Sequence, residues 1–138
     1  MAVRAIAQST ESLLVTPNRI AGGLSVSKYG NRRTTVDGVT YDSAKEARRG
    51  AELRLMERAG LIRDLRRQVR FCLVPTIEGE GRKVRQRAAY YVADFEYWEK
   101  VGDKWRHVVE DVKGVRTDVY KLKKKIMLWR YGIEVREV

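Results

Sequence analysis

The pattern of apolar and polar residues predicts two neighbouring β-strands in the second half of the chain. Residues 90–98 are dense in aromatic and β-branched side chains, and residues 105–113 are again rich in valine. Between them, residues 101–104 contain the Gly-Asp pair of a tight turn. We therefore expect these two segments to form a β-hairpin.

The faces of this hairpin follow from the alternation of side chains along a strand. Asp94 is expected on the same face as Glu96, and Asp111 on the same face as Lys113. Glu110 is one residue out of step with Lys113 and should point to the opposite face. Two carboxylates and an ammonium group can thus converge on one side, where a divalent cation between Asp94 and Asp111 would balance their charge.

Two helices are predicted from their boundary signals. Ser43 and Glu46 have the spacing of a capping box, and Gly60 is a typical stop, so residues 43–59 are expected to be helical. A Thr-Asp pair at 117–118 and Gly132 enclose a second predicted helix at residues 119–131.

Each predicted helix has an apolar side. In the first helix it comprises Ala47, Gly50, Ala51, Leu53, Leu55 and Met56. In the second helix, helical spacing places four apolar residues on one face, and we expect that face to enter the core: Val119, Leu122, Ile126 and Trp129.

The remaining segments complete a single domain. An Asp-Gly turn between β-forming residues predicts a small hairpin at 34–41. Residues 61–68 are either helical or already extended, residues 69–74 form a strand ended by a proline, and residues 133–138 alternate as a final strand. We expect residues 1–27 to be an N-terminal extension, flexible or docked on a partner, and residues 28–138 to be the folded domain.

Composition adds an expectation about partners. The chain has 29 Lys and Arg against 18 Asp and Glu, a formal net charge of +11, which is typical of proteins that bind nucleic acid. A single cysteine excludes an intramolecular disulfide, and no apolar run approaches the roughly 20 residues that span a bilayer. We expect a cytoplasmic protein with no membrane partner.

Candidate DNA contacts are the basic residues of three regions: a turn-like entry, a glycine-rich hairpin tip and the second helix. For each of them a solvated surface charge is the alternative interpretation. They are Lys28, Arg32, Arg33, Arg82, Lys83, Arg85, Lys121, Lys124 and Lys125.

The order helix, strand, strand, strand, helix, strand, with Asp94 on the second core strand and an Asp-Val-Lys motif at 111–113, resembles the PD-(D/E)XK nuclease superfamily. The resemblance covers residues 42–138. The segments at 28–31, 41–47 and 109–114 look like those of small phage-encoded endonucleases, and the layout is similar to archaeal-type Holliday junction-resolving enzymes. The chain departs from the pattern in having Ala93 where a proline is usual, and Asp111 where glutamate is common.

This resemblance implies an α/β, restriction-endonuclease-like αβββαβ core with a central mixed sheet flanked by helices. It also implies a Mg²⁺ cofactor, for which Mn²⁺ substitutes, held by Asp94, Asp111 and the main-chain carbonyl of Val112. Lys113 would orient the attacking water and stabilise the transition state, an electrostatic role that we favour over a general-base role. Glu46 either completes the metal shell or is only the glutamate of the helix cap.

Gln68 has two interpretations of its own. It contacts metal-bound water or DNA, or it is an exposed glutamine at a helix end. His107 lies on the same strand parity as Asp111, and a partly exposed strand histidine is its expected role.

The function that we expect is metal-dependent hydrolysis of DNA phosphodiester bonds, with structure-selective cleavage of branched DNA as in a Holliday junction resolvase. A small basic domain suits recognition of DNA shape, and two symmetric cuts imply a homodimer. A general nicking or end-processing endonuclease of a phage or mobile element is the alternative within this class. A nucleic-acid-binding protein without catalysis is the alternative outside it.

Overall fold

The structure is a computed structural model that describes residues 32–79, 81 and 85–138. Residues 1–27 and three predicted DNA contacts, Lys28, Arg82 and Lys83, lie outside the described residues. The described elements follow in the order β1 (Thr34–Val36), β2 (Val39–Tyr41), α1 (Ala44–Arg58), β3 (Ile62–Val74), β4 (Ile77–Glu78), β5 (Arg85–Gln86), β6 (Ala89–Val101), β7 (Lys104–Asp111), α2 (Asp118–Tyr131) and β8 (Arg136–Glu137).

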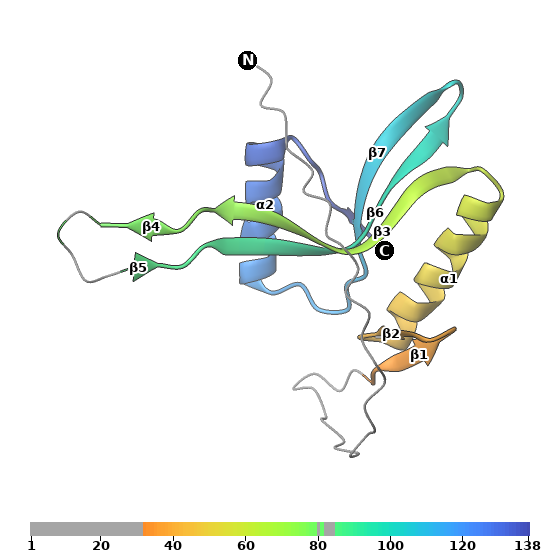
Figure 1. Ribbon diagram of the computed structural model, residues 1–138, viewed down its shortest axis with the longest axis horizontal. Coiled ribbons are helices and arrows are strands. Elements are labelled where there is room, and N and C mark those ends of the chain that lie inside the picture. The colour runs from red at the N-terminus through yellow and green to blue at the C-terminus, as the bar shows by residue number, and fades with distance from the viewer. Residues whose placement is uncertain (1–31, 80, 82–84) are drawn as a thin grey trace.

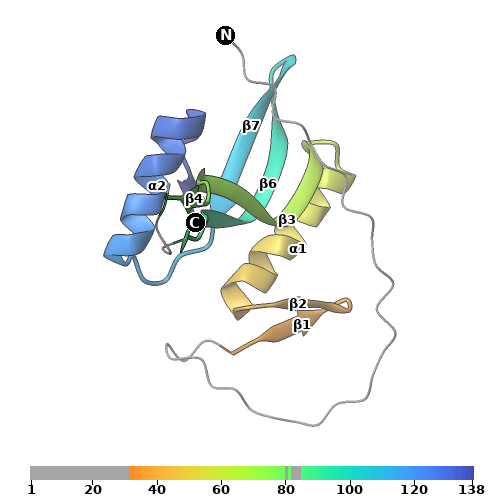
Figure 2. The same ribbon diagram turned by 60° about the vertical axis from the view of Figure 1, so that its left-hand side comes forward.

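A four-stranded sheet with the order β3-β6-β7-β8 forms the centre of the fold. The β3–β6 and β6–β7 pairs are antiparallel, whereas β8 runs parallel to β7 after the crossover through α2. Figure 2 shows this sheet between α2 on one side and α1 on the other. The predicted mixed α/β class with a central mixed sheet and two helices is confirmed.

The second half of strand β7 lies inside the fold. Val108 packs in the same cluster as residues of α1, whereas Val109 packs in a second cluster with Met127 of α2. Because successive strand residues point to opposite faces, β7 is covered on both faces at this point. All four residues 108–111 are buried, so any charge among them needs a partner.

Helix α1 begins and ends where the capping signals predict. Ser43 is its N-cap, and its hydroxyl accepts a hydrogen bond from the Glu46 amide; the C-cap is Ala59, followed by Gly60. Gly50 is required for packing, since a Cβ there would lie 2.8 Å from the buried Tyr41 ring. The prediction that Leu55 faces the core is wrong, because 63% of its surface is exposed.

Helix α2 begins at Asp118, one residue before the predicted start, and ends at Tyr131 as predicted, with Thr117 as N-cap and a left-handed Gly132 as C-cap. The predicted core face of the helix is wrong. Tyr120 and Met127 are buried, while Val119, Leu122 and Trp129 are 63%, 58% and 80% exposed and Ile126 is half-buried. The helix carries apolar residues on two sides, and the shorter set is the one that meets the sheet. No helix among the described residues is long and apolar enough to cross a membrane.

Strand β3 resolves the open question about residues 61–68, which are extended from Ile62 onward. The strand begins at Ile62 and pairs with β6 throughout, with an irregularity between Arg63 and Arg66 where Asp64 has a positive φ of 55°. Beyond Val74 the β3–β6 ribbon continues into the β4–β5 pair, which projects past α2 on the side away from α1 (Figure 1).

Candidate functional site

Asp94 and Asp111 lie opposite each other on neighbouring strands. The register of β6 and β7 runs to the pair Phe95–Glu110, so the next position brings Asp94 beside Asp111, where β7 ends. Asp94 Oδ2 accepts a hydrogen bond of 2.8 Å from the backbone N–H of Val112. The two carboxylates therefore share one face of the sheet, as the alternation of side chains predicts.

Asp111 is 1% exposed and only partly compensated. The hydroxyl of Tyr91 donates a hydrogen bond to its Oδ2. Its Oδ1 is buried and has no hydrogen bond in the described part of the chain, although Lys113 Nζ lies 3.0 Å away as an ion-pair partner. A buried carboxylate oxygen without a hydrogen bond is costly and therefore points to a ligand.

Lys113 has three neighbours that fix its position. Its ammonium group lies by Asp111 and 4.7 Å from the centre of the Tyr120 ring. Its backbone N–H donates to the Val138 carbonyl at 3.2 Å, which ties the segment after β7 to the last residue of the chain. The ammonium is thus held beside the acid pair from both the sheet and α2.

Glu46 serves the start of α1, in a variant of the expected cap. Its Oε2 accepts a hydrogen bond of 3.1 Å from the Asp42 amide instead of the Ser43 amide. Its Oε1 is 3.2 Å from Gln68 Nε2 and 3.4 Å from Arg67 Nη2. The capping interpretation of Glu46 therefore has direct geometric support, and Gln68 connects Glu46 to the aspartates.

Gln68 lies in the middle of β3 and not at a helix end. Its neighbours Arg67 and Val69 pair with Phe95 and Ala93, so Gln68 stands opposite Asp94. Its Nε2 donates to Asp94 Oδ1 at 3.3 Å as well as to Glu46. Its φ of 51° is in the left-handed region that non-glycine residues seldom adopt, and such strain gathers at functional sites.

Burial and the interaction with Asp111 change the pKa of the Asp94 carboxyl group. The pKa of Asp94 is raised to about 7, first by burial and then by the neighbouring Asp111 carboxyl group, against the lowering effect of the Val112 amide. The pKa of the Tyr91 hydroxyl is also raised, first by burial and then by its bond to Asp111. Two carboxylates in contact cannot both ionise cheaply without a counter-charge.

The oxygen atoms of Asp94 and Asp111 are suitable ligands for a divalent cation. They supply two carboxylates, without the third that Glu46 would add as a metal ligand. Hard oxygen ligands are those that Mg²⁺ prefers, and the unbonded Oδ1 of Asp111 supplies one. No group of three or more His, Cys, Asp or Glu side chains in the described ranges is arranged to hold a metal. A cation here would therefore rely on Asp94, Asp111 and main-chain oxygen, with Glu46 engaged elsewhere.

A pocket of about 270 Å³ opens beside Asp111 and Lys113. Strand β6 contributes Tyr91 and Val92 to its wall, and α2 contributes Lys123. The other lining residues are Thr117, Val119 and Tyr120. Asp111 and Lys113 thus border a pocket that opens between the sheet and α2.

The predicted DNA contacts that the structure describes lie away from this pocket. Arg33 is 3.8 Å from Asp42, and Arg85 on β5 is 3.7 Å from Glu78, with all four side chains exposed. Arg32 is exposed before β1.

The predicted lysines of α2 lie outside the pocket as well. Lys121 is 3.5 Å from Asp118, Lys124 is 2.7 Å from Glu137, and Lys125 is exposed. None of these three lysines lines the pocket, and Lys123, which sequence reasoning passed over, is the α2 lysine that does.

Glu110 faces away from the site, as expected. It is fully buried, and Arg49 of α1 binds it through two hydrogen bonds of 2.6 and 2.9 Å. The Tyr97 hydroxyl donates a third bond at 2.7 Å. This buried ion pair anchors α1 to the sheet and leaves Asp111 as the acid available for chemistry.

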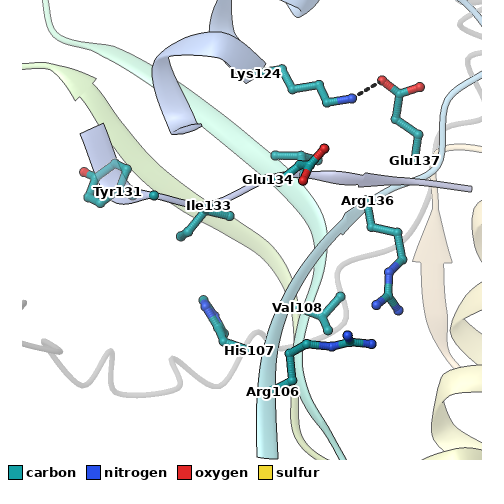
Figure 3. Close-up of a pocket in the computed structure, with 11 residues that line it drawn as sticks. Arg106, His107, Val108, Lys124, Tyr131, Ile133, Glu134, Arg136 and Glu137 are labelled. Carbon is teal, nitrogen blue, oxygen red and sulfur yellow. Dashed lines mark hydrogen bonds and ion pairs between the residues drawn. The ribbon is translucent and has the colours of Figure 1, made fainter. Parts of the chain in front are cut away.

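A larger pocket, of about 700 Å³, lies between β7, the end of α2 and β8 (Figure 3). Most of its charged residues are paired, among them Lys124 with Glu137 at 2.7 Å and Arg136 with Glu99 at 2.8 Å. His107 on its wall lies 2.8 Å from Glu96. We therefore take the smaller pocket as the candidate site, because a buried carboxylate oxygen there is left without a hydrogen bond in the described part of the chain.

Tyr91 and Arg49 contact the two acids at the end of β7, Asp111 and Glu110, and neither contact was predicted from the sequence. Tyr91 is out of step with Asp94 and would be assigned to the other face, yet it lies beyond the end of β7 and its hydroxyl reaches Asp111. Arg49 is one of several arginines in α1, and the sequence does not distinguish it from the exposed ones. The signal that could have identified it is Glu110, an acid predicted to face away from Asp111 and therefore in need of a cationic partner.

Comparison with known proteins adds a family. The family model described as "Protein of unknown function (DUF1064)" matches residues 26–137. The chain belongs to this family. No curated protein and no solved structure matches the chain.

The Arg49–Glu110 pair generates a stability prediction. Arg49→Met leaves a fully buried carboxylate without its cation, so we expect the free energy of unfolding to fall by about 3–5 kcal/mol. Arg48→Met, at the exposed neighbouring position, should change it by less than about 0.5 kcal/mol. Urea unfolding measures both, and equal effects would show that the pair does not anchor α1.

The raised pKa of Asp94 generates a pH prediction. The folded protein keeps a proton that the unfolded chain releases near pH 4, so the wild type loses stability as pH rises through about 7. Asp94→Asn lacks this titration. In EDTA, its free energy of unfolding relative to wild type should rise by about 1 kcal/mol or more between pH 5 and pH 8.

Thermal or urea unfolding at several pH values gives the comparison. Asp103→Asn, on the exposed turn of the same hairpin, is the matched control and should follow the wild-type curve. Parallel curves for Asp94→Asn and wild type would contradict the burial and repulsion assigned to Asp94.

Proposed function

We propose that the protein is a metal-dependent endonuclease that hydrolyses DNA phosphodiester bonds, with a PD-(D/E)XK-type site at Asp94, Asp111 and Lys113. The observation that carries the proposal is the buried Asp111, opposite Asp94, with one oxygen lacking a hydrogen bond and an ammonium group 3.0 Å from it. The order of elements and the mixed sheet agree with the layout expected for this superfamily. The net charge of +11 suits a polyanionic substrate.

Each residue of the site has a defined task in this proposal. Asp94 and Asp111 would hold Mg²⁺ or Mn²⁺ together with a main-chain oxygen, for which the Val112 carbonyl is the candidate. Bound there, the cation supplies a nucleophilic water and offsets charge on the phosphate. Lys113 stabilises the negative charge that develops on the phosphate, and Tyr91 and the Val112 amide fix the orientation of the two carboxylates.

Branched DNA is the substrate that we propose for this site. The described residues form one α/β domain, and among them there is no separate element for reading the DNA sequence. Such a domain suits recognition of the DNA backbone and of DNA shape. Junction resolution needs two symmetric cuts and hence a two-fold dimer.

A nucleic-acid-binding protein without catalysis is the second candidate, and one observation favours it. The Gln68 amide lies within hydrogen-bond distance of both Glu46 and Asp94, so these acids already have a neutral partner in the folded chain. In that case the acidic cluster would serve the structure alone.

Cleavage of a labelled four-way junction beside a linear duplex of the same arm sequence, with and without Mg²⁺, tests the proposal. Wild type should cut the junction at paired symmetric positions. Asp94→Asn, Asp111→Asn and Lys113→Met should each lose at least about 100-fold in rate, because each removes a group that stabilises the transition state.

Glu96→Gln is the matched control, since Glu96 lies two residues from Asp94 on the same strand face but contacts His107. It should retain cleavage. Cutting of both substrates would replace junction resolution with general endonuclease activity. Binding of DNA without cleavage in Mg²⁺ or Mn²⁺ would favour the second candidate.

A further inference from the structure

Two exposed arginines of β3 flank Asp94 on its own face of the sheet. Arg66 pairs with Glu96 and Arg70 with Val92, which are the residues two positions on either side of Asp94 along β6. Residues that pair directly across strands share a face. The two arginines are four residues apart, about 13 Å along the strand, with Asp94 between their levels.

Arg70 is held in place by an aromatic ring. Its guanidinium lies 4.2 Å from the centre of the Tyr90 ring, and 36% of the Tyr90 surface is exposed. A stacked guanidinium loses less freedom when it binds an anion than a free side chain does. Arg70 is therefore prearranged for a ligand on the exposed face of the ribbon.

A third cation approaches the acid pair from α2. Lys123 lines the pocket beside Asp111 and Lys113, and Val92, the cross-strand neighbour of Arg70, lines the same pocket. Cations from two different elements, β3 and α2, thus lie near the acid pair. Lys125, two residues further along α2, is exposed but does not line the pocket.

We propose that Arg66, Arg70 and Lys123 form a track for the phosphate backbone of a nucleic acid strand that crosses the Asp94–Asp111 pair. Spaced positive charges on two elements match the repeated charge of a backbone better than a single small anion. The track rests on the proposed function only for what happens to the strand, since binding itself needs no catalysis. It replaces Lys121, Lys124 and Lys125 as the principal contacts near the site.

Fluorescence anisotropy with a labelled linear duplex and a labelled four-way junction, in EDTA, measures this binding apart from cleavage. Arg66→Ala, Arg70→Ala and Lys123→Ala should each weaken binding about three- to tenfold. Each should also lower the slope of log K against log salt concentration by about 1, because one phosphate contact is lost. Tyr90→Ala should weaken binding less than Arg70→Ala does.

Two controls carry the same change of charge away from the track. Lys125→Ala lies on the same helix, and Arg58→Ala lies in the last turn of α1, roughly 18 Å along the helix from Glu46. Both should bind within about twofold of wild type. The track is refuted if the three track variants, shown to be folded by thermal unfolding, bind no more weakly than these controls.

The same measurements separate the track from the proposed function. If the track variants lose binding selectively and wild type does not cleave in Mg²⁺ or Mn²⁺, the track is supported and the nuclease proposal is rejected. If cleavage depends on Asp94 and Asp111 but the track variants bind as wild type does, the nuclease proposal is supported and the track is rejected.

Discussion

The juxtaposition of Asp94 and Asp111 across β6 and β7 is the constraint on which the rest of the structure depends. Asp111 is buried and Asp94 is half-buried beside it, and the raised pKa of Asp94 records the cost of burial first and of repulsion between the two acids second. The chain partly offsets it with the Val112 amide, the Tyr91 hydroxyl, the Gln68 amide and Lys113. One buried oxygen of Asp111 is still left without a hydrogen bond, which a purely structural cluster would have little reason to retain.

The surrounding fold keeps this arrangement rigid. Glu110, next to Asp111, is locked to α1 by Arg49 and to β6 by Tyr97, so the end of β7 cannot rotate. On the other side, Asp111 and Lys113 exchange backbone hydrogen bonds with Val138, which fixes the segment that leads into α2. Rigid support of this kind is what a site needs if its ligands must stay within a fraction of an ångström of the productive geometry.

Local signals in the sequence were enough to predict the two helices, the central hairpin and the opposite directions of Glu110 and Asp111. These features follow from caps, an apolar alternation and a tight turn, all of which act over a few residues. Position 68 could not be predicted, since nothing in the sequence marks a left-handed residue inside a strand. Its contacts join α1, β3 and β6, which only the folded chain brings together.

The prediction of the core face of α2 was wrong for a related reason. The helix carries apolar residues on two sides, and periodicity ranks the longer set first although Tyr120 and Met127 are the residues that meet the sheet. For the same reason, the sequence does not reveal that Lys123 lines the pocket beside Asp111, whereas Lys121, Lys124 and Lys125 do not. Helix rotation is set by tertiary packing and not by the helix itself.

Calorimetric titration of Mn²⁺ into the metal-free protein tests most directly whether the acid pair is a cation site, independently of any activity. The account predicts saturable binding to wild type and to Glu96→Gln, and loss of that binding in Asp94→Asn and in Asp111→Asn. Absence of saturable binding to wild type, or equal binding to Asp111→Asn, would contradict it and would return the cluster to a purely structural role.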